Sequence, residues 1–114
     1  MKAELALAQR REDERWTRLQ LELRVREGLS AWRTAMAEVE ATTMRVETNR
    51  ESVQAAEGLY RAGKATALDA LTAQADLTRA AAELAQARAA YAAARAQVER
   101  LLGAAANNTT EGPR

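Results

Sequence analysis

Charged side chains are the main groups in this sequence that could carry chemistry, and the two signs are balanced. Its 114 residues include 17 Lys and Arg, 16 Asp and Glu, and neither His nor Cys. The commonest general base and metal ligand is therefore missing, as is the thiol nucleophile. Glu14, Arg18, Glu22 and Arg26 alternate in sign at four-residue spacing, which is typical of a solvated helix face. We expect no catalytic residues, no metal site and no cofactor.

Charge and hydropathy also exclude several classes of partner. The net charge is +1, and the two signs are interspersed rather than gathered into the one-signed patch that nucleic-acid binding needs. The glycines form no phosphate-binding loop. No stretch reaches the ~18 uncharged apolar residues of a membrane span, and the first ten residues lack the apolar run of a signal peptide. We therefore expect a chain that does not bind nucleic acid and does not itself span a membrane.

The composition points to long helices that share a thin seam. The sequence is rich in Ala, has no Phe and has a single Pro near its end, which favours helical coiled coils over a globular core. In the first half, apolar residues recur every seven positions, which indicates one face of a coiled coil in a helix over residues 1–61. These seam residues are Val25, Trp32, Val39, Val46, Val53 and Tyr60.

A break and a second helix follow. Gly63 suits the left-handed position that ends a helix, and Thr66 with Asp69 resembles a capping box that starts the next one. We predict a loop over residues 62–66 and a helix over 67–103, antiparallel to the first because the loop is short. Its seven-residue row starts at Ala70 and continues through the seam residues Leu77, Leu84, Tyr91 and Val98.

The two rows agree on one register. Facing residues of an antiparallel hairpin have numbers with a constant sum, and pairs such as Val46 with Leu84, or Val53 with Leu77, all give 130. The centre falls inside the loop predicted from Gly63 and Thr66, so two separate signals coincide. The fold class is thus an all-α, antiparallel two-helix coiled-coil hairpin. Residues 1–27 are left as an overhang without an intrachain partner, and residues 104–114 are predicted to be a disordered tail.

The hairpin tip resembles the TolC-like family of outer-membrane efflux channels, in its C-terminal repeat. The stretch from Tyr60 to Gln74 matches that family's pattern of Tyr, Gly, Ser or Thr, Asp, Leu and Ala-Gln, and Leu101-Leu102-Gly103 matches its Leu-Leu-Gly ending. The resemblance covers about residues 20–103. It implies a transport protein and not an enzyme.

The resemblance also implies partners and a location. Members of that family are trimers whose helices form a periplasmic tube, and the tips of these helices meet a periplasmic adaptor that links the channel to an inner-membrane transporter. The docking residues here would be Gly63, Lys64, Ala65, Thr66 and Asp69. This chain shows no strand segment, signal peptide or first hairpin repeat. We therefore expect the periplasmic helical part of an outer-membrane protein, whose cargo is drugs, metal ions or proteins according to the pump.

Two alternatives stay open at this point. The chain could be the hairpin of a periplasmic adaptor, although its loop lacks the Ser that such tips carry. It could also be a generic structural coiled coil, which would show neither trimer formation nor adaptor binding.

Overall fold

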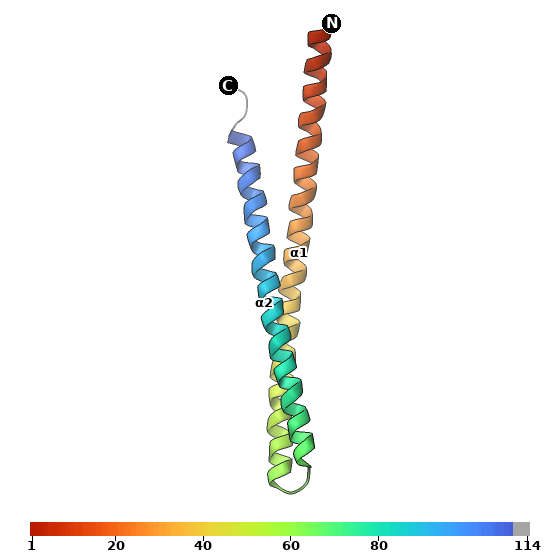
Figure 1. Cartoon of the computed structure of the whole chain (residues 1–114). Coiled ribbons are helices and arrows are strands. Elements are labelled where there is room, and N and C mark those ends of the chain that lie inside the picture. Colours follow the sequence, from red (N-terminus) through yellow and green to blue (C-terminus); the bar gives the residue numbers. More distant parts are fainter. Residues whose placement is uncertain (111–114) are drawn as a thin grey trace. The chain divides into compact units, whose positions relative to one another are not determined.

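The computed structural model describes residues 1–110 and consists of two long helices joined by a tight turn (Figure 1). Helix α1 spans Lys2–Arg61 and helix α2 spans Ala67–Thr110. No strand occurs among these described residues. The predicted fold class, an all-α antiparallel hairpin, is confirmed.

Both helices pass through two compact units of the chain. One unit is Arg33–Ala93, which contains the turn and the adjoining halves of both helices. The other combines Met1–Trp32 with the chain from Ala94 onward. Each unit is described separately below.

In the unit Arg33–Ala93, the least exposed side chains follow the heptad rows. The buried residues are Thr42, Val46, Val53, Ala80 and Ala87. Val39, Leu77, Leu84 and Tyr91 are partly buried. Thr42 is the one polar member of the buried set, and its hydroxyl donates to the carbonyl oxygens of Glu38 at 2.7 Å and Val39 at 3.2 Å. Its hydroxyl is thus satisfied within its own helix.

Tyr60 departs from the predicted seam. It is 51% exposed, although it occupies the same heptad row as the buried Val46 and Val53. The residue that faces it in the predicted register is Ala70, whose methyl group is too small to cover an aromatic ring. The row is therefore correct as a face of α1, but the apolar seam ends before the helix does.

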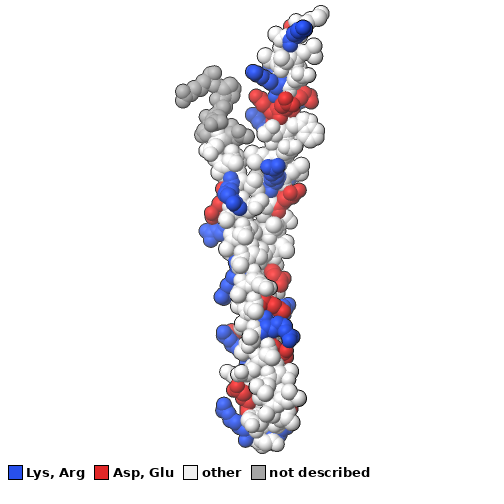
Figure 2. Space-filling model, viewed as in Figure 1, with Lys and Arg blue, Asp and Glu red and all other residues white. Residues whose placement is uncertain are grey.

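Charged side chains are spread over the surface of the hairpin. Figure 2 shows Lys and Arg interspersed with Asp and Glu, separated by broad uncharged areas. Ion pairs within a helix include Arg50–Glu47 at 3.2 Å and Arg79–Asp76 at 3.7 Å. Exposed pairs of this kind contribute little to stability. The visible surface carries no one-signed patch.

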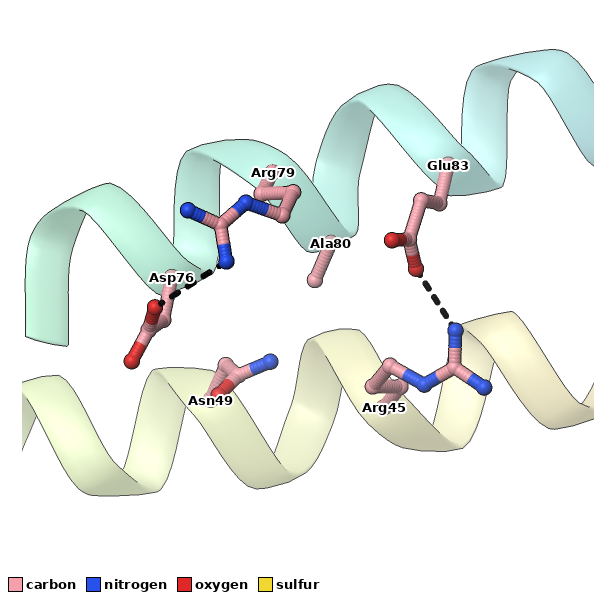
Figure 3. Close-up of a pocket in the computed structure, with 6 residues that line it drawn as sticks. All are labelled: Arg45, Asn49, Asp76, Arg79, Ala80 and Glu83. Carbon is pink, nitrogen blue, oxygen red and sulfur yellow. Dashed lines mark hydrogen bonds and ion pairs between the residues drawn. The ribbon is translucent and has the colours of Figure 1, made fainter.

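Two polar contacts between the helices report the register. Arg45 Nη1 lies 2.6 Å from Glu83 Oε2 (Figure 3), and Gln74 Nε2 donates to Glu57 Oε1 at 3.4 Å. The residue numbers of these contacts add to 128 and 131. Both values lie within two of the predicted 130, which is less than one helical turn. The contacts therefore support the predicted alignment of the two helices.

A designed disulfide tests this register. Val46→Cys with Leu84→Cys should oxidise readily, because the two residues face each other in the seam and a disulfide needs Cα atoms within ~7 Å. Val46→Cys with Arg88→Cys is offset by four residues, or ~6 Å along the helix, and should oxidise poorly. Thiol titration of both variants after mild oxidation gives the answer. Preferential oxidation of the offset pair would show that the register is wrong.

In the other unit, α1 and α2 approach closely at Gly28. A Cβ atom added there would lie 3.3 Å from Leu101 Cδ1 and 3.4 Å from Val98 Cγ2. Val98 is buried, and Val25 and Trp32 are partly buried. A Cβ at residue 28 would thus fit tightly against two side chains of α2, in a helix interior where glycine costs up to about 1 kcal/mol relative to Ala.

Helix α2 is longer than the sequence predicted. It continues through Gly103 to Thr110, so residues 104–110 are helical rather than a disordered tail. Gly103 is followed directly by three Ala residues, the best helix formers, which favour continuing the helix. The last part of the predicted tail, residues 111–114, lies outside the described residues.

The longer α2 also shortens the predicted overhang. Leu21 and Val25 are partly buried, and Leu21 lines a shallow groove of about 220 Å³ with Ala104 of α2. Every residue from 1 to 20 is exposed. Because Thr17 of α1 lines the same groove as Ala104 of α2, the predicted overhang of residues 1–27 is too long.

Candidate functional site: the hairpin tip

The turn begins with a Schellman motif at the end of α1. Gly63 has φ +73°, and its N–H donates to the Tyr60 carbonyl at 3.0 Å, while the Lys64 N–H donates to the Leu59 carbonyl at 2.9 Å. These two bonds satisfy carbonyl groups that a helix end otherwise leaves unpaired. The left-handed conformation predicted for Gly63 is confirmed, and it fixes the direction in which the chain leaves α1.

The turn ends with a reciprocal capping box at the start of α2. The Thr66 N–H donates to Asp69 Oδ2 at 3.1 Å, and the Asp69 N–H donates to Thr66 Oγ1 at 3.2 Å. This is the capping box that the sequence predicted, with Asp in the usual place of Glu. The hydrogen bond from the Thr66 backbone, followed by that from its side chain, lowers the pKa of Asp69 below its ordinary value of 3.8.

The cap should make stability depend on pH. Because the pKa of Asp69 is lowered in the folded state, its contribution is present above about pH 4 and is lost as pH falls through the folded pKa. Thermal unfolding midpoints of the wild type and Asp69→Asn should therefore differ near neutral pH and converge toward pH 2. A difference that stays constant over this range would contradict an ionised cap.

Two glycine substitutions should have opposite effects. Gly63→Val places a β-branched residue at positive φ and should destabilise the hairpin by about 1–2 kcal/mol. Gly58→Ala should stabilise it by about 0.5–1 kcal/mol, because a Cβ at Gly58 has no neighbouring atom within 4 Å. Urea unfolding of both variants checks the signs. Equal effects of the two changes would contradict the different roles given to these glycines.

The remaining tip residues form a firmly held but accessible surface. Lys64 is exposed and Ala65 is partly buried. Four large apolar side chains around the turn are also exposed, namely Leu59, Tyr60, Leu68 and Leu71. Exposed apolar groups beside a polar loop are typical of protein contact surfaces. All five predicted docking residues, Gly63, Lys64, Ala65, Thr66 and Asp69, thus lie in or beside one turn.

A polar groove along the hairpin is a weaker candidate site. It has a volume of about 340 Å³ and is lined by Arg45, Asn49, Asp76, Arg79, Ala80 and Glu83 (Figure 3). Its two cations are each paired with one of its two carboxylates, and Asn49 lies between the pairs. Because these charges already neutralise each other, the groove offers no net charge to a ligand. Among the described residues, no group of three or more His, Cys, Asp or Glu side chains could hold a metal ion.

Sequence reasoning missed the cross-helix contacts Arg45–Glu83 and Glu57–Gln74. A signal was present, because the predicted sum of 130 places each pair opposite one another. The heptad analysis followed apolar residues only and so left out the polar residues that flank the seam.

Comparison with known proteins decides between the alternatives left by the sequence. The family model described as outer membrane efflux protein matches residues 1–104. The chain belongs to the outer membrane efflux protein family. This is a family of transport proteins of the outer membrane, and membership favours the channel hairpin over an adaptor hairpin or a generic coiled coil.

The other comparisons add no relative of this outer membrane efflux protein. No curated protein and no solved structure matched the chain. Within residues 1–110, neither helix has a stretch both long and apolar enough to cross a membrane.

Proposed function

We propose that the chain is a periplasmic helical hairpin of an efflux or secretion channel, and that its tip docks to the periplasmic adaptor of a tripartite pump. The hairpin forms part of the helical wall of the conduit, in a channel assembled from three copies. The adaptor connects the channel to an inner-membrane transporter. The observation that carries this proposal is that the efflux family model matches residues 1–104. The tip of this hairpin is closed by a Schellman motif on one side and a capping box on the other.

The geometry of the tip supports docking. A Schellman motif closes one side of the turn and a capping box closes the other, so the loop needs little ordering when a partner binds. Rigid loops lose less conformational entropy on binding than flexible ones. Lys64 projects from this loop with no ion-pair partner among the described residues, which leaves its charge available to a partner.

The faces turned away from the seam support a place in a wall of helices. In the unit Arg33–Ala93, α2 carries a second heptad row on its far side that contains no charged residue and is exposed throughout. This row is Leu71, Ala75, Thr78, Ala82, Ala85, Ala89 and Ala92. Small residues at heptad spacing allow a further helix to approach closely. A hairpin inside a tube needs such a face for its neighbour.

The start of α1 supports contacts beyond this chain as well. Leu5, Leu7, Trp16 and Leu19 are between 55% and 64% exposed, in a segment of α1 whose residues are all exposed. Apolar side chains of this size are usually covered in a working assembly.

Nuclear magnetic resonance titration of the labelled chain with a periplasmic adaptor hairpin tests the docking role. We expect chemical-shift changes confined to residues 62–69. The dissociation constant should be roughly 10⁻⁴ M or weaker, because one tip buries little surface and the trimer supplies avidity. Shift changes spread along both helices, or none up to millimolar adaptor, would contradict docking through the tip.

A further inference from the structure

The apolar seam does not reach the hairpin tip. In the unit Arg33–Ala93, the last buried side chain of α1 is Val53 and the first of α2 is Ala80. Between them, Ala56, Ala70 and Ala73 are only partly buried, and Tyr60 is exposed. Apolar packing is therefore weakest where the proposed docking loop begins, and it does little to fix the angle between the two helix ends.

A polar bridge lies in this gap. Gln74 Nε2 donates to Glu57 Oε1 at 3.4 Å, and Arg61 Nη2 lies 3.9 Å from the other oxygen of the same carboxylate. The Glu57 side chain is 39% exposed, half the value of Arg61 at 79%. Glu57 thus connects Arg61, in the last turn of α1, with Gln74, at the start of the third turn of α2, from a partly shielded position.

No other side-chain hydrogen bond or ion pair links the two helices within residues 54–79 of the described chain. The Schellman motif and the capping box each act on one helix end and its adjoining loop residue. They determine the local shape of the turn but make no contact between α1 and α2 beyond it. The side-chain contact that joins the two helices next to the turn is the hydrogen bond between Gln74 and Glu57.

We propose that Glu57 and Gln74 are positioning residues that set the direction in which the loop of residues 62–66 is presented to its partner. This inference rests on the proposed docking role of the tip. The bridge acts through the loop and does not itself touch the partner. Its loss leaves the turn intact but lets the tip take a wider range of orientations, so that fewer molecules present the loop correctly at any moment.

The variant Gln74→Leu removes the bridge. Gln54→Leu is its matched control, because Gln54 is exposed and makes no hydrogen bond across the helices within the described part of the chain. Spin labels at Leu59→Cys and Leu71→Cys, two exposed positions at the same level of the register, report the spread of helix separations. Titration with the adaptor hairpin, as above, reports docking. Circular dichroism melts report folding.

We expect Gln74→Leu to broaden the label distances and to weaken adaptor binding by about three- to ten-fold, the loss expected for one typical hydrogen bond. Helicity and melting midpoint should match those of Gln54→Leu. Exchanging the two groups, Glu57→Gln with Gln74→Glu, restores a donor and an acceptor across the gap. It should recover both the narrow distances and the binding.

Unchanged label distances in Gln74→Leu would overturn the inference, as would broadened distances without any loss of binding. A failure of the exchanged pair to recover binding would also count against it. If the parent chain does not bind the adaptor hairpin, the proposed function fails, and the role of the bridge in presenting the loop to the adaptor fails with it. In that case the label distances still decide whether the bridge fixes the tip.

Discussion

Reversing the charge at the tip with Lys64→Glu is expected to lower export by about ten-fold or more while leaving the hairpin folded. Lys64 is exposed and lies outside the capping box and the seam, so its side chain is free to meet the adaptor. A reversed charge at a contact surface turns attraction into repulsion. Because the channel is proposed to present three copies of the tip, the loss of binding free energy at each tip adds up over the three contacts.

Export should be measured in cells whose channel carries the variant, alongside Arg88→Glu as the control. Arg88 is an exposed residue of α2, away from the tip, and it makes no ion pair among the described residues. Arg88→Glu makes the same change of charge and should export normally. Equal export by both variants would mean that the tip is a turn and not a docking surface.

Placing a charge in the seam with Val46→Asp is expected to have the largest effect on folding. Val46 is 5% exposed and sits one helical turn from the buried Thr42. An unpaired carboxylate there costs several kcal/mol, either by burial or by protonation. A hairpin with a thin, Ala-rich seam has little stability in reserve, so we expect the cooperative unfolding transition to disappear at neutral pH.

The control for this variant is Thr48→Asp, two residues along the same helix and exposed. It adds the same charge on the far side of α1 and should change the unfolding midpoint little. Circular dichroism during urea titration compares the two. A normal transition for Val46→Asp would show that the seam does not run through this residue.

Most of the hairpin could be predicted from the sequence, because its signals are local and periodic. The seven-residue rows identified the face that Val46 and Val53 bury. The turn was predictable because Gly63 can adopt the positive φ that ends α1, and Thr66 can pair with unsatisfied amide groups at the start of α2. The heptad rows and the turn signals both depend on residues close together along the chain, so no tertiary information was needed to predict them.

The errors occurred where packing overrides local pattern. Tyr60 continues the heptad row, but its exposure depends on the size of the residue opposite, which periodicity does not measure. Gly103 resembles a helix end, yet α2 passes through it, because the three Ala residues that follow favour helix and Ala105 is partly buried. Gly28 was unexplained until the structure placed Leu101 against it.

The proposed docking role of the tip rests on a resemblance and on family membership, and no intrachain contact could reveal it. A partner-binding surface can be recognised by exposed apolar or charged side chains that the fold leaves uncovered. The exposed leucines beside the turn and the unpaired Lys64 are examples. The far face of α2 is another.

Photo-cross-linking in living cells tests the central claim most directly. A photoreactive amino acid placed at Lys64 of the channel should join it to the periplasmic adaptor on irradiation, and the same amino acid at Arg88 should not. The adduct should be lost when the adaptor is deleted, and mass spectrometry should place the joined adaptor residue at the tip of its own hairpin. Adduct formation at Arg88 but not at Lys64, or none at either in cells with an active pump, would contradict docking through the tip.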